Sequence, residues 1–311
     1  MFFIIIYTEG EHGMQEISDT KIVYKNIGKI FFALACFVAI RKTLPSFYQM
    51  STKQVINSSV NSIVAGFIGL FIFLIFRGKK LFTYDMKVTA KRMNGKSFLK
   101  FFICVLAVQS VMAWCINLTE SVLNGAGITM YGGIFDTNVA SIPAMTIIVG
   151  VLIGPLIEEI IFRGAVMRTL ESKGKVLAIL ISAILFGFYH CAFMQGMFAV
   201  FVGIIFAFVA IEYSLKWALL LHCINNFLAG GLNMAKYAIP VGLSWIIEYG
   251  IPVIFLILAI IVCAKDKDTI KDYVQGNRPE KGCYKSVFRS VWFWVFLIST
   301  FLLAATTIQK L

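Results

Sequence analysis

Charged side chains are scarce in this sequence. Asp, Glu, Lys and Arg make up 14% of its 311 residues, whereas about 25% is usual in a soluble domain. Apolar residues make up 59% and the mean hydropathy is +0.85. A chain this apolar cannot be disordered, and a soluble globule could not bury so much apolar surface. The composition predicts an all-α, polytopic transmembrane helix bundle.

Acidic residues are fewer than basic ones, 16 against 28, which gives a formal net charge of +12. The basic residues are concentrated at 77–96 and 265–289, between apolar stretches, where they set membrane topology or contact anionic lipid. We therefore expect the membrane lipid bilayer as a partner and no nucleic acid. The seven cysteines form no disulfide framework, because their number is odd and several lie inside apolar runs.

Apolar stretches of about 20 residues are typical of membrane spans. The sequence predicts about eight to nine spans, drawn from 27–44, 57–76, 98–118, 140–169, 176–193, 196–213, 216–233, 245–264 and 288–308. The first is weak because Arg41 and Lys42 fall near its end, and Pro155 predicts a kink in the fourth.

The basic residues of alternate loops predict the orientation of the chain. They place four segments in the cytoplasm, namely 77–97, 170–175, 214–216 and 265–287. Only Arg41, Lys42 and Lys53, between the first two spans, argue against this orientation.

Charged residues inside an apolar stretch are costly in hydrocarbon and need a partner or a function. The stretch 150–170 contains Glu158, Glu159 and Arg163. Glu159 and Arg163 are four residues apart, so they can pair on one helix face, whereas Glu158 is turned about 100° away. One carboxylate therefore looks structural and the other available, although an ion-pair patch at a helix end would also explain the segment.

The chain has three histidines, and two of them lie in apolar stretches. His190 ends the run 176–190, and His222 lies one helical turn before Asn226. A single histidine in an apolar helix is usually a hydrogen-bonded packing residue. Two of them, together with the Glu158–Arg163 segment on a third helix, indicate a shared site. Cys191 and Cys223 are assigned no role.

These residue types suit two kinds of chemistry. A carboxylate and an imidazole can bind and deprotonate a water molecule, and His222 with Asn226 has the i,i+4 spacing of two donors to an oxyanion. Alternatively, Glu158, His190 and His222 are a typical zinc ligand set with an open position for water. Other hydrolase motifs are absent, since the chain has no His-Glu-x-x-His, no Gly-x-Ser-x-Gly and no Gly-Asp pair.

Three short motifs resemble those of the CAAX protease and bacteriocin-processing (CPBP, or Abi) family. Residues 158–164 resemble its Glu-Glu-x-x-x-Arg motif, 186–190 its Phe-x-x-x-His motif, and 222–226 its His-x-x-x-Asn motif. They occur in the order of the family, over about 150–228, a quarter of the chain.

The resemblance implies an intramembrane endopeptidase whose cavity faces the cytoplasm. By position, Glu158 would activate water with His190, His222 and Asn226 would form the oxyanion hole, and Glu159 and Arg163 would organise the site. The family has been described both as glutamate-dependent and as metal-dependent. We favour the glutamate mechanism without a metal, because Asn226 is a poor zinc ligand, and zinc is the alternative cofactor.

Family substrates range from prenylated CAAX proteins to peptide pheromones and bacteriocin precursors, so we expect a membrane-associated peptide or lipidated protein. The Ile-, Phe- and Lys-rich composition is typical of an AT-rich bacterial genome, which favours a substrate without a prenyl group, and we place the protein in a bacterial cell membrane. A non-catalytic binding or bacteriocin-immunity protein, or a proton-coupled transporter, are the alternatives. We divide the chain into N-terminal spans with a basic loop, the CPBP-like core helices, and C-terminal spans with a second basic loop: 1–140, 141–233 and 234–311.

Overall fold

The computed structural model describes residues 2–52, 58–130, 144–238, 240–279 and 282–311, and almost all of them are helical. Lys53, the first residues of the predicted stretch 140–169 and part of the basic segment 265–287 lie outside these ranges. The principal helices are α1 (Phe2–Thr52), α2 (Ser58–Arg77), α3 (Gly95–Gly125), α7 (Lys175–Tyr189), α8 (Phe193–Glu212), α9 (Leu215–Ala238), α11 (Ile251–Lys265) and α14 (Val291–Ala305).

Shorter elements connect these helices. They are the π-helix η1 (Leu81–Asp85), the helices α10 (Val241–Trp245), α12 (Lys267–Gly276) and α13 (Cys283–Phe288), the π-helix η6 (Ile246–Gly250), and the strands β1 (Ile128–Thr129) and β2 (Gln309–Lys310). The two strands pair antiparallel, with Ile128 opposite Lys310.

A composite helix crosses the bundle between Ala144 and Lys173 without interruption. It consists of α4 (Ala144–Ile148), η3 (Val149–Ile153), α5 (Gly154–Glu159), η4 (Ile160–Met167), α6 (Arg168–Leu170) and η5 (Glu171–Lys173), of which η3 and η4 are π-helical. Pro155, the second residue of α5, has no N–H to donate, so the helical hydrogen-bond pattern changes beside it.

Six helices in the described part of the chain are long and apolar enough to cross a membrane. They are Asn26–Thr52, Ser59–Arg77, Gly95–Gly125, Ala144–Lys173, Phe193–Glu212 and Leu243–Lys265, and Lys175–Tyr189 and Val291–Ala305 are shorter apolar helices. The all-α polytopic bundle is therefore confirmed, whereas the count of eight to nine spans is not.

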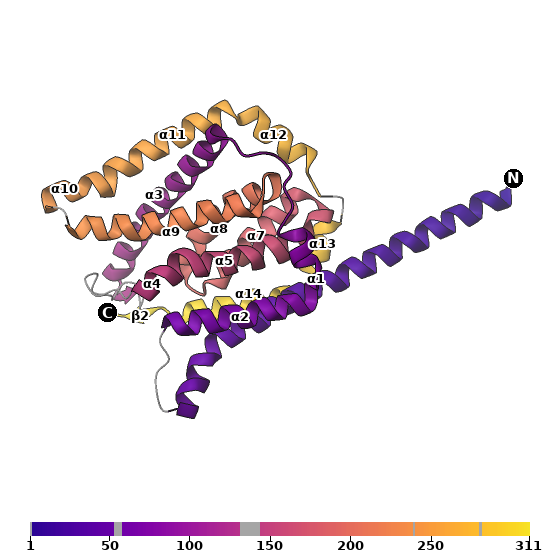
Figure 1. Ribbon diagram of the computed structural model, residues 1–311, viewed down its shortest axis with the longest axis horizontal. Helices are drawn as coiled ribbons and strands as arrows, with labels where there is room; N and C mark the ends of the chain where they lie inside the picture. Colours follow the sequence, from indigo (N-terminus) through magenta and orange to yellow (C-terminus); the bar gives the residue numbers. More distant parts are fainter. Residues whose placement is uncertain (1, 53–57, 131–143, 239, 280–281) are drawn as a thin grey trace.

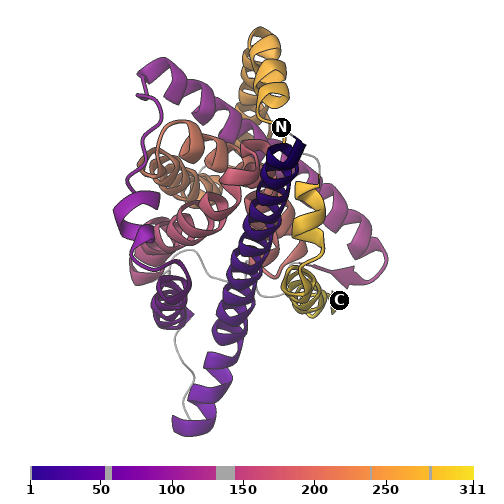
Figure 2. The same ribbon diagram turned by 90° about the vertical axis from the view of Figure 1, so that its right-hand side faces the viewer.

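The composite helix, α7, α8 and α9 form the centre of the bundle, and α1, α2 and α14 cover one side of it (Figure 1). In Figure 2, α1 runs between α2 and α14. Fully buried phenylalanines from these helices fill one continuous core: Phe31, Phe37, Phe73, Phe162, Phe186, Phe206, Phe293 and Phe296.

Helices α7 and α8 pack closely because glycine lies at their contact. A Cβ atom on Gly187 would lie 2.3 Å from Val200 Cγ2 and 2.6 Å from the carbonyl oxygen of Gly196. Only glycine permits this approach, which brings the end of α7 against the start of α8. The geometry of this contact determines where His190, three residues after Gly187, can lie.

The four basic segments lie together at one end of the bundle. Ala90 N–H donates to the carbonyl of Tyr213 (3.0 Å). The buried carboxylate of Glu212 binds Lys91 Nζ at 3.0 Å and Lys175 Nζ at 2.7 Å and accepts the hydroxyl of Tyr273 at 3.0 Å. These contacts join 77–97, 170–175 and 265–287 to the end of α8, which leads into 214–216.

Candidate functional site

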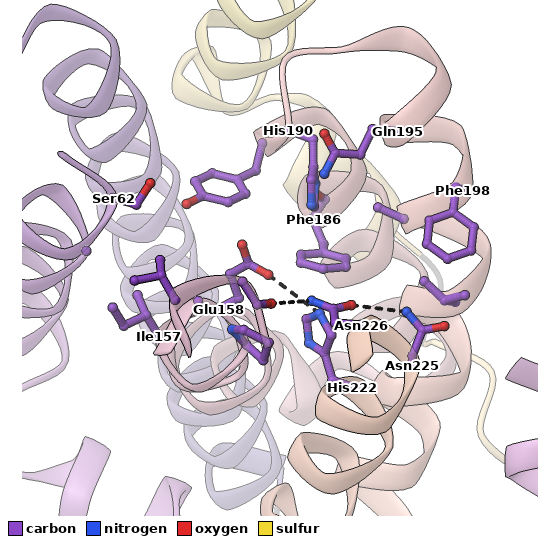
Figure 3. Close-up of a pocket in the computed structure, with 18 of the residues that line it drawn as sticks. Ser62, Ile157, Glu158, Phe186, His190, Gln195, Phe198, His222, Asn225 and Asn226 are labelled. Carbon is purple, nitrogen blue, oxygen red and sulfur yellow. Dashed lines mark hydrogen bonds and ion pairs between the residues drawn. The ribbon is translucent and has the colours of Figure 1, made fainter. Parts of the chain in front are cut away.

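Several helices line one cavity of about 230 Å³, and three separate segments bring the predicted catalytic residues to it. Glu158 comes from α5, His190 from the end of α7, and His222 and Asn226 from α9. Figure 3 shows these side chains converging from their different helices. The structure thus brings together all four residues to which the sequence assigns catalytic roles.

The two adjacent glutamates have different environments. The side chain of Glu159 is 0% exposed and that of Glu158 is 17% exposed. Because they lie on successive positions of α5, they point about 100° apart, and only Glu158 lines the cavity. The π-helical turns η3 and η4 flank this short helix, an arrangement that is frequent at functional sites.

Glu159 lies in a buried polar cluster beneath the cavity. Its Oε1 is 3.1 Å from Arg163 Nη1, so the ion pair that the i,i+4 spacing predicts is present. The same oxygen is 2.9 Å from His222 Nδ1. Arg163 also donates from Nη2 to the carbonyl of Gly203 (3.3 Å), and its guanidinium lies 4.2 Å from the centre of the Phe186 ring.

His222 lies between the two glutamates. A carboxylate oxygen can only accept from an imidazole N–H, so an ionised Glu159 places a proton on Nδ1. Nε2 is 3.7 Å from Glu158 Oε2, too far for a direct hydrogen bond. Phe206 stacks on the imidazole at 4.8 Å. The ring is therefore oriented on one side by Glu159, and its other nitrogen faces Glu158 and the cavity.

His190 is oriented by its own helix. Its Nδ1 is 2.8 Å from the carbonyl oxygen of Phe186, so this nitrogen is a donor and Nε2 of the neutral ring is an acceptor. The chain reverses directly after it, because Cys191 has a φ of 53°, which is uncommon for a residue with a side chain. The Phe186 ring contacts both imidazoles edge-on, at 4.9 Å from His190 and 5.7 Å from His222.

Asn226 is oriented by two hydrogen bonds. Its Nδ2 donates to the carbonyl of Gly150 (2.9 Å), and its Oδ1 accepts from Asn225 Nδ2 (3.1 Å). The amide group has two N–H donors, so one remains for a ligand in the cavity. The dashed lines of Figure 3 follow this connection between Asn225 and Asn226.

Among the described residues, no group of three or more His, Cys, Asp or Glu side chains is arranged so that it could hold a metal ion. In the zinc alternative, Glu158, His190 and His222 would be the ligands. Nδ1 of each histidine is hydrogen-bonded, which leaves Nε2 as the nitrogen for a metal, a pattern that also occurs in zinc sites. The donor types are therefore compatible with zinc, although their arrangement here is not that of a formed metal centre.

Several cavity residues were not predicted from the sequence. Tyr189, which precedes His190, packs against Phe162 at 5.3 Å between ring centres. Arg41 also lines the cavity, although in the sequence it only weakened the first predicted span and the predicted orientation. Its position inside an apolar stretch was the signal that could have identified it, because the same reasoning selected Arg163.

The fold and the cavity define a class of protein: a polytopic helical membrane protein with carboxylate, imidazole and amide groups gathered in its interior. Residues 140–228 match the family model described as Rce1-like type II CAAX prenyl endopeptidase. This segment contains all three motifs and is consistent with the CPBP family. The similarity covers 89 of the 311 residues and supports a protease-like domain in this segment. No curated protein and no solved structure matches the chain.

Replacing Arg163 by alanine should strongly destabilise the protein. The substitution leaves the carboxylate of Glu159 buried without its cation, at a cost of about 3–5 kcal/mol. We expect a lower yield of purified protein and a lower unfolding temperature in detergent. Arg289→Ala, at an exposed position outside the spans, is the matched control. Equal unfolding temperatures for Arg163→Ala and the unmodified protein would show that the ion pair does not support the site.

Proposed function

We propose that this protein is an intramembrane endopeptidase that uses Glu158 as a general base and needs no metal. The observation that carries the proposal is the separation of the two glutamates. Arg163 neutralises Glu159 in a fully buried pair, whereas Glu158 faces the cavity with no basic nitrogen closer than His222 Nε2, at 3.7 Å, among the described ion pairs. A carboxylate that is partly exposed to a cavity and forms no ion pair with an arginine can accept a proton from water.

Water activation would use two acceptors. A water molecule between Glu158 and His190 can donate one hydrogen to a carboxylate oxygen and the other to Nε2, which orients its lone pair towards a peptide carbonyl. As the oxygen attacks the carbonyl carbon, its proton passes to Glu158, and the C=O electron pair moves to the oxygen. Glu158 then gives the proton to the leaving amine when the C–N bond breaks, so the carboxylate is regenerated.

The oxyanion that forms needs hydrogen-bond donors. Asn226 has one N–H beyond its bond to Gly150, and its orientation is set by Asn225. His222 can donate from Nε2 only when both ring nitrogens carry protons, because Nδ1 donates to Glu159. Donors positioned before the reaction stabilise the developing charge without reorganisation.

The substrate that this site supports is a membrane-associated peptide or a lipidated protein. The match to CAAX prenyl endopeptidases supports a prenylated substrate, and the wider CPBP resemblance keeps peptide pheromones and bacteriocin precursors open. A non-catalytic binding or immunity protein with the same fold is the second candidate, because it would need the buried Glu159–Arg163 pair but not the exposed carboxylate of Glu158. We also propose that the protein lies in a bacterial cell membrane.

Glu158→Gln should abolish cleavage and leave the protein folded, because glutamine keeps the volume and cannot accept the proton. The assay is the release of product from a prenylated CAAX peptide, a pheromone precursor and a bacteriocin precursor by purified protein in lipid. Asp268→Asn, an exposed position on α12, is the control and should cleave normally. Undiminished cleavage by Glu158→Gln would overturn the role of this residue, and no cleavage by the unmodified protein would favour the non-catalytic alternative.

Asn226→Ala should slow turnover by about 10²–10³-fold, the effect of losing one oxyanion donor. If zinc were the cofactor, Asn226 would be at most a supporting residue, whose loss costs about 10–100-fold. Metal content separates the two mechanisms where these ranges meet. We expect active protein to contain much less than one equivalent of zinc and to survive a strong chelator. Stoichiometric zinc, with activity lost on chelation and restored by zinc, would instead establish the metal mechanism.

The position of the cavity along α7 and α8 indicates the side of the membrane from which a substrate reaches it. The basic residues predict which segments are cytoplasmic, and the family resemblance implies a site that faces the cytoplasm. At 1.5 Å per residue, His190 lies about 22 Å along α7 from Lys175, and Gln195, an exposed cavity residue, lies about 25 Å along α8 from Glu212. The hydrocarbon core is about 30 Å thick. We propose that the basic segments are cytoplasmic and that the cavity is reached from the opposite half of the membrane.

Cysteine labelling in intact cells would test this orientation. In a variant without native cysteines, a membrane-impermeant maleimide should label Gln195→Cys from outside, because this residue lies at the cavity end of α8. Lys173→Cys, at the basic end, should react only after the membrane is permeabilised. The reverse pattern would establish a cavity that faces the cytoplasm, as the family resemblance implies.

A further inference from the structure

Arg41 is a half-buried arginine that lacks a carboxylate partner. It lies inside the candidate span Asn26–Thr52, where a charged side chain is costly unless it has a partner or a function. Among the described residues, no carboxylate oxygen lies within 4.0 Å of its guanidinium. Three other arginines each form such an ion pair: Arg77 with Asp85, Arg163 with Glu159, and Arg168 with Glu171.

The guanidinium is oriented by aromatic and backbone contacts. Its Cζ lies 4.6 Å from the centre of the Tyr189 ring, and Nη1 donates to the Tyr189 carbonyl at 3.4 Å. Phe37, four residues earlier on the same face of α1, stacks on the same ring at 5.2 Å. Stacking leaves the edge of the guanidinium, with most of its five N–H donors, available to a ligand.

Arg41 and Glu158 line the same cavity and attract each other electrostatically, but they do not form a direct ion pair. The nearest basic nitrogen to Glu158 belongs to His222. Both charges therefore remain available to a molecule that occupies the cavity. A substrate bound there would meet the proposed base and the guanidinium of Arg41 in the same cavity.

We propose that Arg41 is a substrate-binding, specificity-determining residue whose guanidinium binds the C-terminal carboxylate of a peptide. The inference rests on the proposed endopeptidase function. A planar guanidinium binds carboxylates through two parallel hydrogen bonds. The cavity of about 230 Å³ is smaller than the 300–1,000 Å³ typical of sites for drug-sized ligands, so it suits a short stretch of chain. A stretch that ends inside the cavity brings its carboxylate with it.

Short apolar peptides can test this role without requiring cleavage. The probes are dansyl-Val-Leu-Leu with a free carboxylate, the same peptide with a carboxamide, and dansyl-Val-Leu-Glu carboxamide. Their affinities for the full-length protein in detergent are measured by fluorescence anisotropy. We expect the free carboxylate to bind about 10–100-fold more tightly than the carboxamide, as for a hydrogen bond to a charged group. The glutamate probe distinguishes a side-chain carboxylate from a C-terminal one.

Arg41→Gln should remove this preference by weakening only the free-carboxylate probe, and Arg41→Lys should retain part of it. Lys42→Gln, an adjacent exposed lysine on α1, removes the same charge and should keep the full preference. Equal binding of the first two probes by the unmodified protein, or a preference that persists in folded Arg41→Gln, would overturn the proposal. Binding of these probes requires no cleavage, so a failure of the proposed catalytic function, which the cleavage assay measures, is distinguishable from a failure at Arg41.

Discussion

The buried ion pair between Glu159 and Arg163 is the interaction on which the site depends. Both side chains are 0% exposed, and each charge alone would be very costly at this depth. The pair also orients its neighbours, because Glu159 Oε1 is 2.9 Å from His222 Nδ1. By pairing internally, these two residues determine the direction of an imidazole on another helix and leave the adjacent carboxylate of Glu158 for other chemistry.

Close helix packing supports this ion pair. Arg163 reaches the carbonyl of Gly203 on α8, and a Cβ atom at Gly203 would lie 3.3 Å from Nη2 and 3.1 Å from Phe186 Cδ1. Ser182 of α7 donates its hydroxyl to the carbonyl of Phe162 at 2.9 Å. A small residue on α8 and a hydroxyl on α7 thus bring two helices against the composite helix that carries both glutamates. The close packing of these helices positions the acceptors of the polar cluster, and the hydrogen bonds of the cluster in turn stabilise the packing.

Local spacing made part of the site predictable. The pairing of Glu159 with Arg163 follows from helix geometry over four residues, and the scarcity of charged residues makes each one in an apolar stretch conspicuous. Contacts between distant segments were not predictable, because nothing in the sequence relates Arg41 to Tyr189, 148 positions away. The number of spans is not confirmed, because α7 has only 15 residues and six helices of the described chain meet the length and hydropathy of a membrane span.

The charges around the cavity are nearly balanced, which explains how so many ionisable groups can lie within a membrane-spanning bundle. Two glutamates are matched by two arginines, but the two matches differ in kind. Glu159 and Arg163 lie in contact on one helix, whereas Glu158 and Arg41 come from different helices and stay apart across the cavity. Direct pairing of Glu158 with Arg41 would close the space that a substrate needs. The presence of both residues keeps the total charge low, and their separation leaves one carboxylate and one guanidinium available to a ligand.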